Sequence, residues 1–120
     1  MIRLPENQQI GIDIVKIERF RKKKIFENQS FYEKIFTESE ISYCKGFIDP
    51  YPHFAGKFAL KEALIKSIDK KISLSEIETS HFDSKPIVKI LEDNENYRFL
   101  ASVSHENEFA IAVVICEKLR

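Results

Sequence analysis

The chain has 120 residues, 43% of them hydrophobic and 32% charged, and its formal net charge is zero. This composition is typical of a soluble globular protein and excludes a largely disordered one, so we expect a single domain over residues 1–120. A zero net charge argues against a surface that binds nucleic acid as a whole, although it leaves room for a local basic patch.

The cysteines and the N-terminus indicate a reducing compartment. Cys44 and Cys116 are far apart and form no CxxC or Cys/His spacing, so neither a disulfide framework nor a structural zinc site is expected. Residues 1–9 lack the apolar core of a signal peptide. No apolar run reaches the ~18 residues that a membrane span requires. We therefore expect a cytoplasmic protein with no membrane partner.

The first predicted element is a β-strand over residues 10–17, a short run rich in Ile and Val. Asp13 lies in its middle, between Ile12 and Ile14. A carboxylate in this position either faces solvent, which is the commoner case for a lone Asp, or is buried beside a cation. Gly11 would let another backbone or a ligand approach the strand closely.

A basic run follows the strand and predicts the start of a helix with a positive face. Its cations are Arg19, Arg21, Lys22, Lys23 and Lys24. Such a run is usually a solvated surface. The functional alternative is a docking patch for an acidic partner, which could be nucleic acid, anionic lipid or an acidic protein.

Two short helical segments are expected next. Residues 31–36 predict one helical turn. Thr37 is a predicted N-cap with Glu40 at the N3 position, the pattern of a capping box, and opens a helix that continues through Cys44. Residues 46–53, which include Pro50 and Pro52, break that helix.

Residues 54–68 predict the central helix, whose apolar positions extend most of the way round. A helix that is apolar all round is usually buried. Lys57 and Lys61 share one side of it, whereas Glu62 and Lys66 share another. Buried ionisable groups need partners. From periodicity alone, a surface helix with a Glu62–Lys66 ion pair is slightly favoured.

The C-terminal part predicts strands. An extended stretch from Ile72 to Phe82 is followed by strands over 87–91, 97–105 and 109–116, with turns at 83–86, 92–96 and 106–108. These strands predict an antiparallel meander packed against helices. The fold class is therefore α+β, with an antiparallel sheet against a long central helix.

Two motifs in this order resemble the signature of the 4′-phosphopantetheinyl transferase family. The first is Gly11-Ile-Asp13 in the strand, and the second is Lys57-Phe-Ala-Leu-Lys-Glu-Ala-Leu-Ile-Lys66 in the helix. Residues 31–40, 102–105 and 110–114 are similar to the short bacterial branch of that family, so the resemblance runs from about residue 10 to 116. The chain departs from the family pattern at Ser67–Lys71 and Ser84, where glycines are usual, and at Lys57, where Arg is common.

The resemblance implies an enzyme of fatty acid biosynthesis. It would transfer the 4′-phosphopantetheine arm of coenzyme A to a serine of apo-acyl carrier protein, with Mg²⁺, and release adenosine 3′,5′-bisphosphate. The implied metal ligands are Asp13 and Glu62, which with Lys66 form the catalytic group. The implied coenzyme A contacts are Lys57, Lys61, Lys66, Pro86 and His105. Either a metal-bound water or Glu62 would accept the serine proton.

The same resemblance gives the basic run an acidic partner, the acyl carrier protein, which residues Arg19 to Lys24 would steer and dock. It also implies a homotrimer with sites between neighbouring subunits. Two alternatives stay open. One is a small nucleic-acid-binding module that uses the basic run and leaves Asp13 and Glu62 without a role. The other is a Mg²⁺-dependent hydrolase of a nucleotide diphosphate, in which water replaces the serine.

Overall fold

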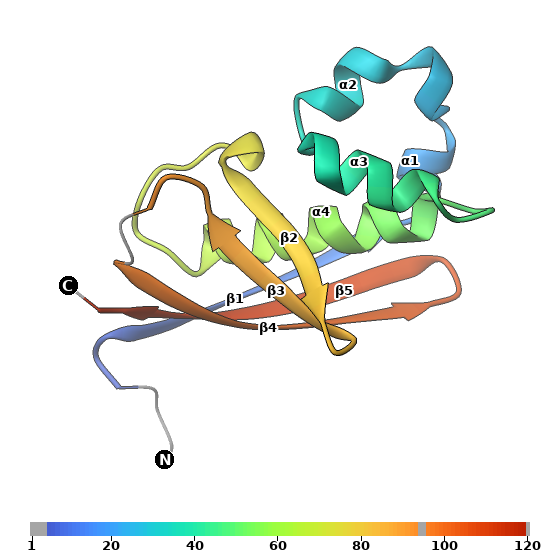
Figure 1. The fold of residues 1–120 in the computed structure, drawn as a ribbon. Coiled ribbons are helices and arrows are strands. Elements are labelled where there is room, and N and C mark those ends of the chain that lie inside the picture. Colours follow the sequence, from blue (N-terminus) through green and yellow to red (C-terminus); the bar gives the residue numbers. More distant parts are fainter. Residues whose placement is uncertain (1–4, 94–95, 120) are drawn as a thin grey trace.

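The long helix α4 (Tyr51–Lys66) lies across one face of a three-stranded antiparallel sheet (Figure 1). The computed structural model describes residues 5–93 and 96–119. The strand order is β1 (Gln8–Lys16), β5 (Phe109–Lys118), β4 (Tyr97–Glu106), and a separate hairpin joins β2 (Ile77–Phe82) to β3 (Lys85–Ile90). The short helices are α1 (Glu18–Arg21), η1 (Ile25–Glu27), α2 (Gln29–Glu33), α3 (Glu38–Lys45) and η2 (Leu74–Glu76). The predicted α+β class is confirmed.

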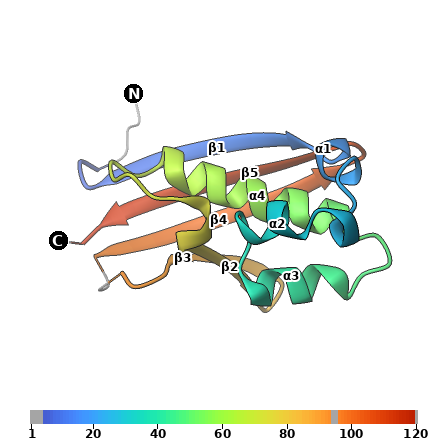
Figure 2. The same ribbon diagram turned by 90° about the horizontal axis from the view of Figure 1, so that it is seen from above.

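The helices α1, α2 and α3 form a cap over the N-terminal end of α4 (Figure 2). Aromatic rings hold this cap in place. Phe20 of α1 meets Phe58 of α4 edge-on at 5.5 Å between ring centroids, and Tyr32 of α2 lies 4.7 Å from Phe54. All four rings are buried, so the cap and α4 share one apolar core.

The main differences from the predicted elements concern the start of α4 and the order of the strands. Helix α4 begins at Tyr51, three residues earlier than predicted, because the first turn of a helix accepts Pro52 without losing a hydrogen bond. The predicted meander is interrupted, since β3 and β4 do not pair and the central strand β5 pairs with β1 and β4. The predicted turn at 92–96 and the N-terminal stretch 1–9 lie partly outside the described residues. No helix in the described part is long and apolar enough to cross a membrane.

Strand β1 passes unusually close to α4 at Gly11. A Cβ on Gly11 would lie 2.0 Å from the carbonyl oxygen of Ala63 and 2.9 Å from the backbone nitrogen of Ser67. Only glycine permits this approach of two backbones. Since side chains alternate along a strand, Asp13 faces the helix as Gly11 does. The contact at Gly11 therefore fixes the distance between Asp13 and α4.

A buried carboxylate joins α3, α4 and β2. The side chain of Glu40 has no exposed surface, and its Oε1 lies 2.6 Å from Nζ of Lys61, which is also fully buried. Its Oε2 accepts hydrogen bonds from the backbone N–H (2.8 Å) and the hydroxyl (2.6 Å) of Thr79. Glu40 also accepts from the backbone N–H of Thr37 at 2.8 Å and so completes the predicted capping box, which is confirmed.

Replacing Gly11 with alanine tests the close approach of β1 and α4. Gly11→Ala must push the two backbones apart, so we expect a loss of about 1–3 kcal/mol in the free energy of unfolding. The matched control is Gly46→Ala, because Gly46 has φ −73° and a Cβ there would come no nearer than 3.3 Å to a neighbouring backbone atom, the carbonyl oxygen of Tyr43. Denaturant unfolding of both variants makes the comparison, and equal stability would contradict the steric argument.

Removing the Glu40 carboxylate tests the buried ion pair. Glu40→Ala leaves the ammonium of Lys61 without its counter-ion, and we expect a loss of about 3–5 kcal/mol in the free energy of unfolding. Arg98→Gln is the control, because it breaks an exposed pair with Glu117 at 3.5 Å and costs less than about 1 kcal/mol. Chemical denaturation measures both, and a loss for Glu40→Ala no larger than the control's would refute the role assigned to Glu40.

Candidate active site

One group of predicted site residues, Asp13, Glu62 and Lys66, lies where β1 crosses the last turns of α4. We call this place the carboxylate edge. Nζ of Lys66 contacts Oδ1 of Asp13 at 3.0 Å and donates to the carbonyl oxygen of Ile12 at 3.1 Å. The Asp13 side chain is 15% exposed, so it faces the helix and not open solvent. Glu62 is half-buried one helical turn before Lys66 and on the same side of the helix. The structure thus brings Asp13 and Lys66 into contact, and helix geometry places Glu62 on the side of α4 that carries Lys66.

The donor set at this edge suits a hard divalent cation. Mg²⁺ is typically held by one or two carboxylates together with phosphate and water oxygens. Asp13 and Glu62 are two such carboxylates, and the ammonium that now contacts Asp13 belongs to a long, half-exposed side chain. Among the described residues, no cluster of three or more His, Cys, Asp or Glu side chains could hold a metal by itself. A cation here would therefore need oxygens from a bound substrate.

A second set of predicted residues, Lys57, Pro86 and His105, lies at the opposite edge of the sheet, which we call the histidine edge. His105 lies near the end of β4, and its Nε2 lies 3.0 Å from the carbonyl oxygen of Pro52. Gly56 makes room for this ring, because a Cβ there would lie 2.6 Å from Nε2. Lys57 and His105 line one small pocket, and Pro86 pairs in the hairpin with His81 of the same pocket.

The hairpin that carries Pro86 turns without a glycine. Asp83 and Ser84 have φ values of 49° and 65°, so both adopt the left-handed conformation of a two-residue turn. Ser84 stands where the resemblance leads one to expect glycine. The departure in sequence therefore leaves the turn intact.

The two edges face away from each other. Lys57 and Lys66 are nine residues apart in α4, which places them on opposite sides of a helix with 3.6 residues per turn. Asp13 pairs with Ala112, which pairs in turn with Val103, so Asp13 and β4 are separated by the whole of β5. Within one chain the two sets of residues therefore do not line one continuous pocket.

Lys61 and Lys57 are placed differently from the expectation. Lys61 is fully buried and donates to the carbonyl oxygens of Ile35 (2.7 Å) and Leu74 (3.1 Å) besides its pair with Glu40. Its three donor positions are thus occupied within the fold. Burial lowers the pKa of Lys61, and the adjacent Glu40 opposes this shift. The expected contact of Lys61 with coenzyme A is therefore revised to a structural one, because no N–H remains for a phosphate.

Lys57 is also nearly buried, at 4% exposure, but it reaches the second pocket. Its Nζ donates to the carbonyl oxygen and the hydroxyl oxygen of Thr79, both at 3.1 Å, and lies 4.7 Å from the ring centroid of Tyr43. Burial lowers the pKa of Lys57. Sequence reasoning missed Glu40 and Thr79 as partners of these lysines. The sequence indicates that a buried cation needs a partner, but it does not indicate which residue of the fold supplies that partner.

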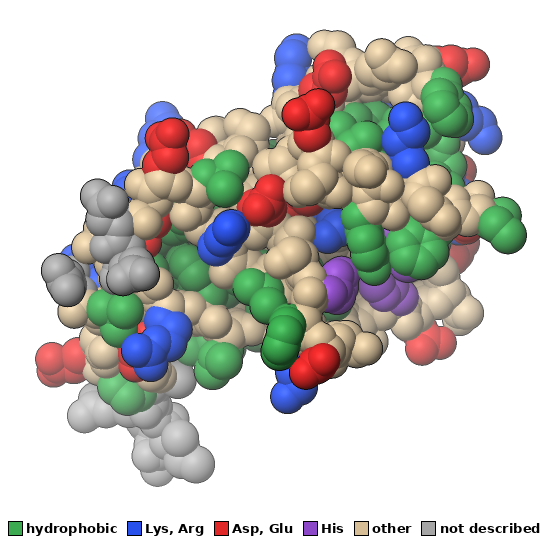
Figure 3. Space-filling model, in the orientation of Figure 1, with side chains coloured by type: hydrophobic (Ala, Val, Ile, Leu, Met, Phe, Trp, Pro, Cys, Tyr) green, Lys and Arg blue, Asp and Glu red, His purple; other side chains and the backbone are tan. Residues whose placement is uncertain are grey.

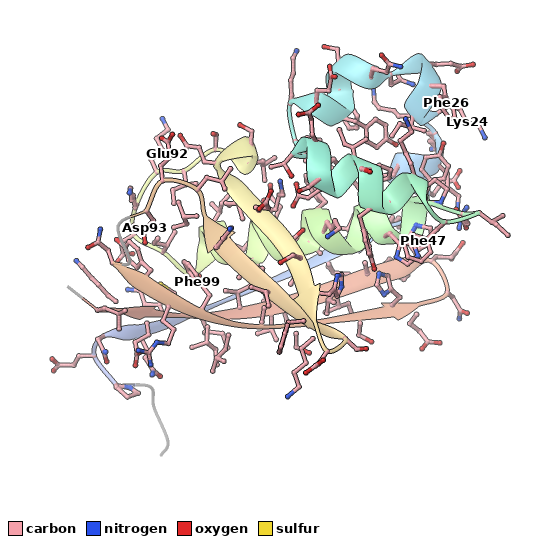
Figure 4. The ribbon with its side chains drawn as sticks, viewed as in Figure 1. Lys24, Phe26, Phe47, Glu92, Asp93 and Phe99 are labelled. Atoms are coloured by element: carbon pink, nitrogen blue, oxygen red, sulfur yellow. The ribbon has the colours of Figure 1, made fainter. Side chains whose placement is uncertain are left out.

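The basic run lines a groove beside the C-terminal end of β1. The groove has a volume of ≈ 620 Å³, and its charged lining consists of the cations Lys16, Arg19, Lys22 and Lys23 and the acids Glu18 and Glu108. Two other predicted docking residues lie elsewhere. Arg21 pairs with Asp49 at 2.8 Å, and Lys24 lies with Phe26 at the outer end of the helical cap (Figure 4).

The sheet face opposite α4 is apolar, and no part of the chain that the structure describes covers it. Ile10, Ile12 and Ile14 of β1 are 56–61% exposed, and beside them lie Leu100 of β4 (69%) and Ile111 of β5 (40%). An exposed apolar surface that follows three neighbouring strands is typical of an interaction surface.

Comparisons with known proteins agree with this architecture. The family model of the 4′-phosphopantetheinyl transferase superfamily matches residues 9–114. The holo-[acyl-carrier-protein] synthase of Thermodesulfovibrio yellowstonii is 42% identical over 111 residues, which are 88% of this chain and 95% of that protein. The protein of the same name from Chlamydia trachomatis serovar L2 is 40% identical over 116 residues, 90% and 98% of the two chains.

Solved structures show the same likeness. The Helicobacter pylori holo-[acyl-carrier-protein] synthase in complex with coenzyme A has a TM-score of 0.76 and 39% identity, over 90% of this chain and 99% of that one. The Bacillus anthracis enzyme in complex with CoA (3′,5′-ADP) has a TM-score of 0.76 and 35% identity, over 92% and 96%. The paired motifs, the fold and these relatives lead to one conclusion: this chain belongs to the 4′-phosphopantetheinyl transferase superfamily.

Proposed function

We propose that this protein is a holo-[acyl-carrier-protein] synthase, which transfers 4′-phosphopantetheine from coenzyme A to a serine of apo-acyl carrier protein for fatty acid biosynthesis in the cytoplasm. The observation that carries the proposal is the contact of Lys66 with Asp13 where β1 crosses α4, with Glu62 one helical turn before Lys66 on the same side of the helix. Its relatives carry that name, and related enzymes have been solved with coenzyme A. The buried free thiols of Cys44 and Cys116 are compatible with a reducing compartment.

The chemistry explains why these residue types are needed. Attack of a serine hydroxyl on the β-phosphate of coenzyme A develops negative charge on the phosphate oxygens, and catalysis of such a transfer is mainly positioning and electrostatic stabilisation. Asp13 and Glu62 would hold Mg²⁺, which when bound supplies positive charge to the diphosphate. The ammonium of Lys66 is close enough to Asp13 to contact a phosphate oxygen at the same place. Either Glu62 or a metal-bound water would accept the serine proton.

Coenzyme A would span two half-sites. Lys66 would bind the diphosphate at the carboxylate edge. Lys57, His105 and Pro86 would contact the nucleotide part at the histidine edge. Because these edges face away from each other in one chain, a complete site requires the carboxylate edge of one subunit beside the histidine edge of its neighbour. The apolar outer face of the sheet supplies a surface for such an assembly, and we assign it to a homotrimer.

The basic groove would dock the acyl carrier protein. Three of its cations, Arg19, Lys22 and Lys23, come from the predicted basic run, and the groove adjoins β1 just beyond Asp13. Complementary charge would steer an acidic carrier toward the reacting diphosphate. Arg21 and Lys24 are less favoured as direct contacts, because Arg21 is paired with Asp49 and Lys24 lies at the outer end of the cap.

Replacing Glu62 with glutamine tests the metal ligand. Glu62→Gln removes a charge that the transfer needs, so we expect kcat/KM for carrier modification to fall by at least about 10²–10³-fold. The free energy of unfolding should change by less than about 1 kcal/mol, because Glu62 is only half-buried. Glu38→Gln, at an exposed acid of α3, is the control. Full activity of Glu62→Gln would contradict the role of Glu62 as a metal ligand.

Reversing charges in the groove tests carrier docking. In the double variant Arg19→Glu/Lys22→Glu, attraction becomes repulsion, so we expect KM for the carrier to rise by about tenfold or more while KM for coenzyme A stays unchanged. Lys118→Glu, at the far end of β5, controls for the loss of positive charge. Steady-state assays with each substrate varied in turn distinguish the two effects, and equal loss for both substrates would rule out a docking role.

The oligomer is tested by mass in solution. If the apolar sheet face is buried between subunits, light scattering should give the mass of three chains, and Ile12→Lys should lower it, because a buried unpaired ammonium is costly. Ser102→Lys, on the same face but on β4, tests how far the interface extends. A wild-type protein with the mass of one chain would contradict the assembly.

A further inference from the structure

The pocket at the histidine edge contains every histidine of the chain. His53 of α4, His81 of β2 and His105 of β4 line it together with Lys57 and Tyr43. Figure 3 shows the histidine side chains gathered on one face of the molecule, beside apolar and lysine side chains. Only His105 belongs to the family motif identified from the sequence. His53 and His81 have no role in the proposed transfer so far.

The floor of this pocket carries an unbalanced positive charge. The buried network contains two ammonium groups, those of Lys57 and Lys61, but one carboxylate, that of Glu40. Lys61 takes the direct ion pair. Among residues 5–93 and 96–119, the ammonium of Lys57 contacts two oxygens of Thr79 and the ring of Tyr43, all of which are neutral. The next acid, Glu78, is already engaged by Ser39 at 2.9 Å and Lys89 at 3.8 Å.

Aromatic neighbours fix the imidazoles in position. The ring of His53 stacks on Phe47 at 3.6 Å between centroids, and that of His81 stacks on Tyr43 at 5.3 Å. Phe47 lies beyond the end of α3, next to the N-terminal end of α4 (Figure 4). The Nε2 of His105 must be the N–H donor to Pro52, because a carbonyl oxygen only accepts. The three rings are therefore held around one space.

The surroundings disfavour protonation of His53 and His81 in the free protein, because they lower the pKa of both rings. Burial, and then the neighbouring His105, lower the pKa of His53, while Asp49 acts in the opposite direction. Burial, and then Lys57, lower the pKa of His81. A bound dianion would reverse this balance, since an opposite charge within a few ångströms favours the charged form of a base.

We propose that His53 and His81 take up protons when a phosphate group of coenzyme A binds beside Lys57 and His105, and so make co-substrate affinity increase as pH falls. This inference rests on the proposed function, because it concerns the same co-substrate. Each proton moves from solvent to an imidazole nitrogen, and no covalent bond to the phosphate forms. His53 and His81 are thus additional binding residues that the motif does not contain.

Calorimetric titration of the wild-type protein with coenzyme A tests this directly. The titration is run near pH 7 in two non-phosphate buffers of different ionisation enthalpy, so that the difference in heat gives the protons taken up. We expect net uptake, and an affinity that falls by about tenfold from about pH 6 to about pH 8. The double variant His53→Gln/His81→Gln should take up fewer protons and show a flatter pH profile. His81→Gln alone is a milder variant on an exposed strand, should the double variant unfold.

Two further ligands identify the group that is recognised. Pantetheine, which has no phosphate, should cause no uptake. Dephospho-coenzyme A lacks the 3′-phosphate, so lost uptake would assign the 3′-phosphate to the pocket. Retained uptake would place the diphosphate there and would contradict its assignment to the carboxylate edge. Equal proton uptake by wild type and the folded variants would overturn this inference alone. Failure of wild type to bind coenzyme A at all would instead overturn the proposed function.

Discussion

The carboxylate of Glu40 is the interaction on which the rest of the structure depends. It lies at the junction of α3, α4 and β2, where it closes the cap of its own helix, neutralises Lys61 and accepts two hydrogen bonds from Thr79. These contacts fix α4 in rotation as well as in position. One consequence is that Glu62, the residue after Lys61, is turned toward β1. Another is that Lys57 is turned toward the histidine pocket.

The same helix therefore organises two surfaces of opposite character. Toward β1 it presents Glu62 and Lys66 beside Asp13, a set suited to a cation and a diphosphate. Toward the hairpin it presents Lys57 beside three imidazoles, a set suited to an anion. A small domain that separates these functions across its own helix can combine them by association. In the proposed trimer, the exposed apolar face of the sheet would be the surface that joins the subunits.

The sequence predicted the local features well. The strand around Asp13 and the Thr37–Glu40 capping box follow from short-range patterns. Periodicity alone slightly favoured a surface helix with a Glu62–Lys66 ion pair, whereas α4 is largely buried and Lys66 pairs with Asp13. The pairing of Asp13 with Lys66 could have been predicted, because the two-part motif associates the strand that carries Asp13 with the helix that carries Lys66. The partners of Lys57 and Lys61 were not, since Thr79 lies 39 residues from Glu40 and joins it only through the tertiary fold. The histidine pocket was missed for the same reason.

The central claim is that this chain uses coenzyme A to modify a carrier protein. The most direct test incubates the purified protein with apo-acyl carrier protein, coenzyme A and Mg²⁺, and follows the carrier by intact-mass spectrometry. The account predicts a mass gain of one phosphopantetheine, abolished by chelation of the metal and by replacement of the acceptor serine. An unmodified carrier in the presence of folded protein and Mg²⁺ would contradict it.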